Sequence, residues 1–251
     1  MIANFLPDSF FLIVAVFVLA GLIKGVVGMG LPTISMALLV LFMAPAQAAA
    51  LLIIPSLMTN LWQAGPLRTL PPLLRRIGGM QWGVAIGALA GALILGAPTG
   101  KSASIALGAA LVVYAGWTLF GRQLNVPART EKWLGPLAGA LTGIITAATG
   151  VFVVPAVPYL QALSLDRDAL IQAMGVSFTV STVALAAGLW INDSYTVGAV
   201  GASLVMLIPA LAGMHAGQFL RRLLSPKAFR TCFLASLLIL GVYLIIERSV
   251  A

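Results

Sequence analysis

The sequence predicts an all-α polytopic membrane protein. Hydrophobic residues make up 61% of the 251 residues and charged residues only 8%, whereas about a quarter of the residues of a soluble domain are charged. Several apolar runs exceed the roughly 18 residues that mark a membrane-spanning helix. Because the runs do not alternate polar and apolar residues as the strands of a membrane barrel do, helices are the expected way to satisfy the backbone hydrogen bonds.

Ten apolar segments follow one another along the chain. They cover residues 9–28, 31–43, 46–64, 79–97, 102–120, 134–150, 151–164, 169–190, 196–219 and 229–247. The segments 31–43 and 151–164 would measure only about 20 Å as helices, against a hydrocarbon core of about 30 Å. Whether these two segments cross the membrane or re-enter it as half-helices stays open at this point.

The basic residues in the short loops between segments predict the orientation. Alternating sides along the ten segments places eleven of them on one face: Arg68, Arg75, Arg76, Arg122, Arg129, Lys132, Arg167, Arg221, Arg222, Lys227 and Arg230. Lys101 and Arg248 fall on the other face. Because cytoplasmic loops carry an excess of Lys and Arg, we expect the first face to be cytoplasmic and both termini to be periplasmic. The same bias accounts for the net charge of +8 without a nucleic-acid partner.

The two halves of the chain resemble each other. Residues 21–25 align with residues 139–143 through their glycines, and after a shift of five residues Pro32 aligns with Pro155. Each half holds five segments, an odd number, so the second half must enter the membrane from the opposite side, as in inverted-topology repeats. We expect one membrane domain made of a first repeat, a cytoplasmic linker and a second repeat, at residues 1–121, 122–132 and 133–251.

Residues 21–32 interrupt the first apolar run with four glycines, one lysine and one proline. A similar glycine-containing stretch at residues 139–150, followed by Pro155, has the matching position in the second half. Glycines let a helix unwind, and the N–H groups at the start of the next half-helix favour an anion. We expect the two breaks to face each other and to bind a small anion near the middle of the membrane. For Gly21 and Gly25 alone, close helix packing explains the spacing equally well.

The candidate binding residues combine these glycines with the one lysine of the first break and with nearby polar side chains. They are Lys24, Gly25, Gly28, Gly30, Thr33, Asn60, Gln63, Thr146, Thr149, Gly150 and Ser177. Lys24 either supplies the counter-charge for the anion or reaches from the end of the first span to the membrane surface. Polar side chains in spans also often link helices without touching a substrate.

His215 is the only side chain expected to titrate near neutral pH without a large shift of its pKa. It is either a packed or interfacial histidine or a proton relay. No Asp or Glu lies inside a predicted span, so proton coupling would have to use His215, the substrate or water. The lack of acids and further histidines argues against an intramembrane enzyme, and we expect no catalytic residue, metal or cofactor.

The motifs resemble those of the TauE/SafE sulfite exporters, also called the TSUP family. The resemblance rests on Gly-Val-Val-Gly-Met-Gly-Leu-Pro at residues 25–32, on the second break at residues 143–155, and on Thr59, Asn60 and Gln63 at the end of the third segment. It implies transport of sulfite, thiosulfate, sulfoacetate or other organosulfonates across the bacterial inner membrane. The second break departs from the family's usual run of glycines by reading Thr-Ala-Ala-Thr-Gly at residues 146–150, which bears on the substrate more than on the family.

We therefore expect a secondary transporter of small sulfur-containing anions that works by alternating access between two inverted halves. The alternative is an anion channel or a facilitated-diffusion pathway for a different small organic anion. The expected partners are the anionic substrate and the lipid bilayer, with a homodimer left open and no nucleic acid.

Overall fold

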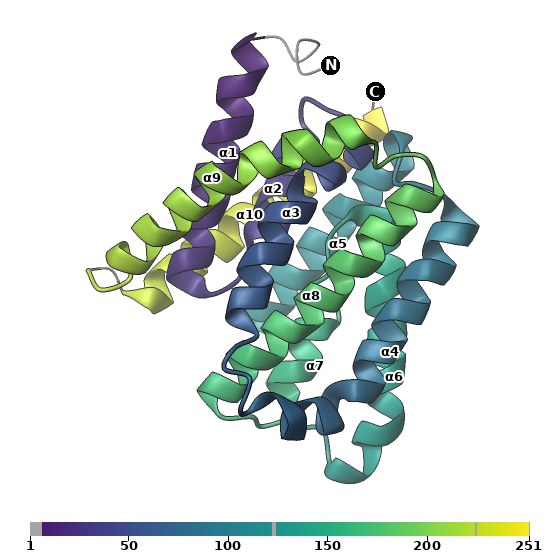
Figure 1. The fold of residues 1–251 in the computed structure, drawn as a ribbon, viewed down its shortest axis with the longest axis vertical. Coiled ribbons are helices and arrows are strands. Elements are labelled where there is room, and N and C mark those ends of the chain that lie inside the picture. The colour runs from purple at the N-terminus through teal and green to yellow at the C-terminus, as the bar shows by residue number, and fades with distance from the viewer. Residues whose placement is uncertain (1–6, 122–123, 224, 251) are drawn as a thin grey trace.

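The structure, a computed structural model, describes residues 7–121, 124–223 and 225–250, and over these ranges it consists of helices without a strand (Figure 1). The helices are α1 (Pro7–Val27), α2 (Leu31–Leu39), α3 (Pro45–Gln63), α4 (Leu70–Leu95), α5 (Gly100–Phe120), α6 (Ala128–Thr149), α7 (Ala156–Ala162), α8 (Arg167–Ile191), α9 (Val197–Leu220) and α10 (Pro226–Val250). The predicted all-α architecture is confirmed.

Two helices begin earlier than the apolar pattern predicted. α4 begins at Leu70 rather than at residue 79, and α6 begins at Ala128 rather than at residue 134. The prediction that Arg75, Arg76, Arg129 and Lys132 lie in loops was wrong, because all four lie in the early turns of these helices. Arginine is a good helix former, so a helix can run past the end of its apolar stretch. Residues 128–132 of the expected linker accordingly belong to α6.

Six helices are long and apolar enough to cross a membrane: α1, α4, α5, α8, α9 and α10. α3 and α6 have 19 and 22 residues but are not among these six. α2 and α7 have only 9 and 7 residues, which corresponds to about 13 and 10 Å of helix. Because a bilayer core is about 30 Å thick, α2 and α7 are half-helices that do not cross it by themselves.

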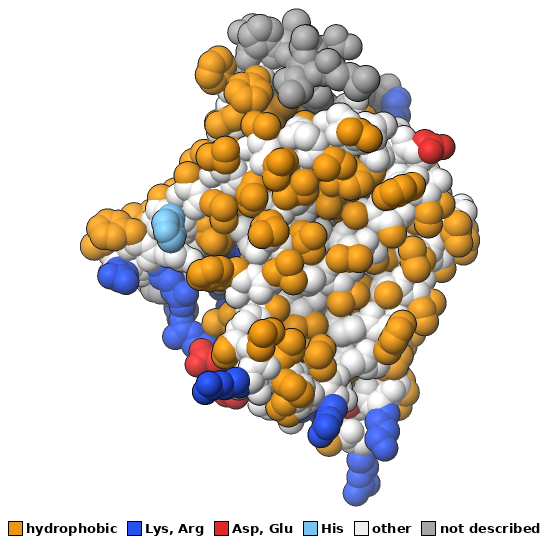
Figure 2. All heavy atoms as spheres, viewed as in Figure 1, with side chains coloured by type: hydrophobic (Ala, Val, Ile, Leu, Met, Phe, Trp, Pro, Cys, Tyr) orange, Lys and Arg blue, Asp and Glu red, His pale blue; other side chains and the backbone are white. Residues whose placement is uncertain are grey.

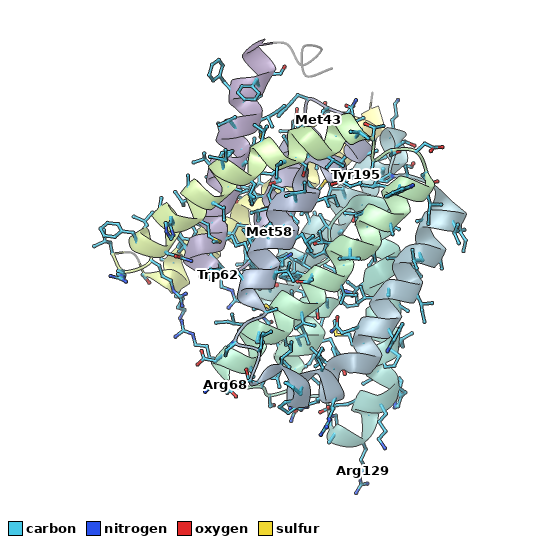
Figure 3. All side chains as sticks on the ribbon, in the orientation of Figure 1. Met43, Met58, Trp62, Arg68, Arg129 and Tyr195 are labelled. Carbon is cyan, nitrogen blue, oxygen red and sulfur yellow. The ribbon has the colours of Figure 1, made fainter. Side chains whose placement is uncertain are left out.

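The basic side chains gather at one end of the helix bundle. Figure 2 shows Lys and Arg along the lower edge of the view, below a broad surface of hydrophobic side chains. Arg68 and Arg129 lie at this end, and Met43 and Tyr195 lie at the opposite end (Figure 3). We call the end that holds Arg68 and Arg129 the basic end. Of the eleven basic residues expected on one face, Arg122 lies outside the described residues.

Both predicted breaks are present in the backbone. α1 ends at Val27, and Gly28 and Gly30 have positive φ angles of 85° and 111° before α2 begins. α6 ends in the same way at Gly150, whose φ is 70°. L-residues with a side chain rarely adopt this left-handed region, so glycine at these positions lets a helix end and the chain change direction.

Glycines bring α1 and α9 into backbone contact. A methyl group added at Gly21 would collide with the carbonyl oxygen of Ala210, and one added at Gly213 would collide with that of Val18. Gly25 and Gly217 repeat this arrangement one turn further along the two helices. Small residues spaced four apart allow such close helix packing in membranes.

α4 and α6 pack against each other through glycines in the same manner. A methyl group at Gly87 would meet the carbonyl oxygen of Ala140, and one at Gly143 would meet that of Val84. At the basic end Arg76 of α4 makes a paired contact with Glu131 of α6, with Nη2 to Oε1 at 2.7 Å and Nε to Oε2 at 3.0 Å. The two helices are therefore joined along their length and at one end.

Pro55 interrupts the hydrogen bonds inside α3. Proline has no N–H group, so the carbonyl of Leu51 has no helical donor. Ser203 of α9 fills the gap, since its Oγ donates to the Leu51 oxygen at 2.8 Å and accepts from the Ile54 nitrogen at 3.0 Å. This bridge fixes the part of α3 that precedes Asn60.

Candidate functional site

A cavity of about 480 Å³ lies between helix ends at the basic end of the bundle. The ends of α1, α3, α8 and α9 contribute Lys24, Gln63, Arg167 and Arg221 to its lining, and Arg230 comes from the first turns of α10. Trp62 of α3, labelled in Figure 3, also lines it. The residues that separate α1 from α2, including Gly28, form part of the wall.

Lys24 forms the most buried basic part of this cavity. Its side chain is 4% exposed, and its Nζ donates a hydrogen bond to Oδ1 of the fully buried Asn60. Nδ2 of Asn60 in turn donates to Thr182 Oγ1 at 3.4 Å. Lys24 thus turns inward to Asn60 of α3. Of the two interpretations of the sequence, the one in which Lys24 reaches the membrane surface was wrong.

The end of α3 supplies further polar groups beside Lys24. Thr59 lines the cavity, but its hydroxyl donates to the carbonyl of Pro55 at 2.7 Å. Gln63 Nε2 donates to the carbonyl of Ile171 in α8 at 3.1 Å. Because that bond uses only one N–H of the amide, Gln63 keeps a second N–H and its oxygen for another partner.

The charged side chains that line the cavity are all basic. Lys24 lies inside, Arg167 is exposed, and Arg221 and Arg230 are partly exposed. Among the described residues no Asp or Glu lines the cavity. A concave surface with charges of one sign raises the local concentration of ions of the opposite sign, so this cavity attracts anions.

The candidate residues of the first break divide between the cavity and the protein interior. Gly25 and Gly28 line the cavity together with Lys24. Gly30 instead contacts Phe233 and Ile23. Thr33 is fully buried in α2, and its hydroxyl has no hydrogen-bond partner in the described part of the chain.

The candidate residues of the second break do not line this cavity. Gly150 packs against Met36 of α2, where an added methyl group would lie 2.9 Å from the Met36 methyl carbon. Thr146 and Thr149 donate to carbonyls within α6 at 2.7 and 2.6 Å. The second break therefore contacts the half-helix that follows the first break rather than the cavity.

Two other candidate residues lie elsewhere. Ser177 of α8 accepts a hydrogen bond of 2.8 Å from Gln81 Nε2 of α4. His215 is exposed on α9, and it is the single histidine of the chain (Figure 2). Neither residue lines the cavity.

Thr182 and the three cavity arginines were missed as candidates. Thr182 lies 122 residues after Asn60 in the chain, and Arg167, Arg221 and Arg230 were interpreted only as signals of orientation. The polar run of α8 could have indicated Thr182, since Ser177, Ser181 and Thr182 follow one another at helical spacing. Across residues 7–121, 124–223 and 225–250, no group of three His, Cys, Asp or Glu side chains could hold a metal ion.

The fold and the cavity define a polytopic membrane protein whose broken helices border an anion-attracting vestibule. The family model described as Sulfite exporter TauE/SafE matches residues 13–244, and the chain belongs to this family. Comparison with curated proteins and with solved structures gave no significant match. Together with the six apolar helices, the family membership supports a role in transport across a membrane.

Proposed function

We propose that the protein is a secondary transporter that carries small sulfur-containing anions across the bacterial inner membrane by alternating access. One observation carries the proposal. Lys24 is the only buried Lys, Arg, Asp or Glu among the described residues, and it borders an anion-attracting cavity beside a helix break. Ionisable groups within membrane spans are costly and mark substrate pathways. The family description, sulfite exporter, supports a sulfur oxyanion as the substrate.

The orientation follows from the basic end. Under the excess of Lys and Arg in cytoplasmic loops, the basic end is the cytoplasmic side and both termini are periplasmic. The cavity then opens to the cytoplasm, where arginines draw anions toward Lys24. Opposite the cavity, Arg248 of α10 donates to the carbonyl of Val40 at the end of α2, at 3.2 Å, and this contact belongs to the closed periplasmic side.

Helix pairing supports an inverted-repeat mechanism. If α1–α5 correspond in order to α6–α10, α1 is equivalent to α6 and α4 is equivalent to α9. The pair of α1 and α9 is then equivalent to the pair of α6 and α4. These are the two pairs that pack through glycines. α3 packs against α8 and α5 against α10, which are pairs that the same exchange leaves unchanged. Rocking of one half against the other is a common way for such repeats to alternate access.

The substrate contacts we assign lie at the cavity. Lys24, Asn60 and Gln63 supply donors, and Gly25 and Gly28 allow the backbone to approach the anion. Thr33, the second break and Ser177 do not line the cavity. We assign them to substrate contacts made in other states of the transport cycle. His215, exposed on α9, is the one histidine available if protons are coupled to transport.

Counterflow in proteoliposomes tests the proposal. Vesicles loaded with unlabelled sulfite should accumulate labelled sulfite from outside transiently and with saturation, because a carrier exchanges one bound substrate for another. A channel would equilibrate the label without accumulating it. Lys24→Ala should lower the apparent affinity by about 10- to 100-fold, since hydrogen bonds to charged groups contribute about 1.5–3 kcal/mol. Lys132→Ala, which removes an exposed lysine at the basic end, is the matched control and should leave the affinity unchanged.

A further inference from the structure

Lys24 is a buried cation whose one hydrogen-bond partner in the described residues is neutral. The Asn60 amide accepts from Nζ but offers no negative charge. An ammonium group has three N–H donors, so two remain for a ligand after the bond to Asn60. Burying an unpaired charge is costly, and an anion bound beside Nζ lowers that cost.

The arginines of the cavity are more exposed than Lys24. Arg167 is exposed, and Arg221 and Arg230 are partly exposed at the basic end. Water and salt screen such charges over a distance of about 8 Å. These side chains attract a divalent anion at least as strongly as a monovalent one, so a preference for a single charge has to arise at Lys24. Closure of the cavity leaves a bound anion with Lys24 and the neutral side chains around it.

We propose that this site selects anions that carry one negative charge over anions of similar shape that carry two. A monovalent anion neutralises Lys24, whereas a divalent anion leaves one negative charge unpaired in a buried site. The inference rests on the proposed function, because it names the charge of the substrate at the same site. It has a second consequence. The loaded site is neutral when it changes its side of access, and the empty site carries the charge of Lys24.

Binding to the purified full chain tests the selection directly. Methanesulfonate and sulfate are both tetrahedral around sulfur but carry one and two charges at neutral pH. We expect methanesulfonate to bind at least about tenfold more tightly than sulfate by titration calorimetry at fixed pH and ionic strength. The difference reflects the cost of burying the second charge of sulfate without a partner, reduced because water still hydrates part of it. Lys24→Arg, which retains the positive charge, should retain this preference, whereas Lys24→Gln should lose both the preference and most of the affinity.

The outcomes separate the selection from the transporter proposal. If sulfate binds as tightly as methanesulfonate or more tightly, and Lys24→Gln weakens both, the anion site stands and charge selection is overturned. If neither anion binds the wild-type chain, the proposed function falls and the selection falls with it. Correct folding of each variant is checked by elution of a single peak on size exclusion and by its tryptophan fluorescence.

Transport across proteoliposomes provides an independent measurement. Exchange of methanesulfonate for methanesulfonate uses only the loaded, neutral site, so its rate should not respond to a membrane potential set with potassium and valinomycin. Net efflux requires the empty, charged site to return and should respond. An exchange rate that changes with the potential as strongly as net efflux would overturn the inference.

Discussion

Gly213 in α9 is the position where the contact between α1 and α9 can be tested most directly. Its Cα faces the carbonyl oxygen of Val18, and an added methyl group would overlap that oxygen. Gly201, three turns earlier in the same helix, is exposed and has open space around the corresponding position. Gly213→Ala therefore introduces a collision with α1, and Gly201→Ala makes the same chemical change in the same helix without one.

The expected difference follows from these surroundings. Both substitutions gain the same helix propensity, about 0.5–1 kcal/mol for alanine over glycine. Only Gly213→Ala adds overpacking, which typically costs about 1–3 kcal/mol. Because the colliding atom is backbone and cannot rotate away, we expect the upper end of this range. At about 2–4 °C for each kcal/mol in a chain of this length, the two variants should differ by roughly 6–12 °C in Tm.

Thermal unfolding of the two purified variants measures this difference. The five tryptophans allow it to be followed by intrinsic fluorescence in one detergent at one heating rate. Gly201→Ala should unfold at or slightly above the temperature of the wild type. Equal Tm values for Gly213→Ala and Gly201→Ala would refute the backbone contact between α1 and α9.

Three further substitutions test the break, the bridge in α3 and the cavity rim. Gly28→Asn should keep more transport activity than Gly28→Val, because asparagine tolerates a positive φ far better than a β-branched residue; equal uptake by the two variants would contradict this explanation. Ser203→Ala should lower the unfolding free energy by about 1–3 kcal/mol, because it leaves the Leu51 oxygen without its donor, and an unchanged thermal transition would show that water replaces the serine. Arg221→Gln should slow anion uptake at low salt and have little effect at high salt, since a rim charge acts through screened attraction; an equal loss at both salt concentrations would indicate a direct contact with the substrate.

The helix breaks could be predicted because their cause is local. A positive φ, as at Gly28, Gly30 and Gly150, strongly favours glycine, and the surrounding apolar runs make these glycines conspicuous. The shortness of α2 and α7 follows from the same breaks. Lys24 could be selected as a candidate because a charge in an apolar run is rare.

The hydrogen bonds from Lys24 to Asn60 and from Asn60 to Thr182 depend on helix packing rather than on local sequence. Asn60 and Thr182 lie in different halves of the chain and meet because α3 packs against α8. The neighbourhood of Gly150 depends on where α2 returns, which the sequence pattern does not specify. The start of α4 at Leu70 was missed for a different reason, since an apolar window ends where basic residues begin although the helix continues.

Pro55 divides α3 into two parts with different attachments. Ser203 ties the first part to α9, and Asn60, one turn after the proline, is tied to Lys24 of α1. A helix bends most readily at a proline, so these contacts fix the direction of α3 on each side of Pro55. The bonds of Asn60 to Lys24 and to Thr182 join the second part of α3 to α1 and α8. The direction of α3 beyond Pro55 therefore depends on side chains that border the cavity or lie next to it.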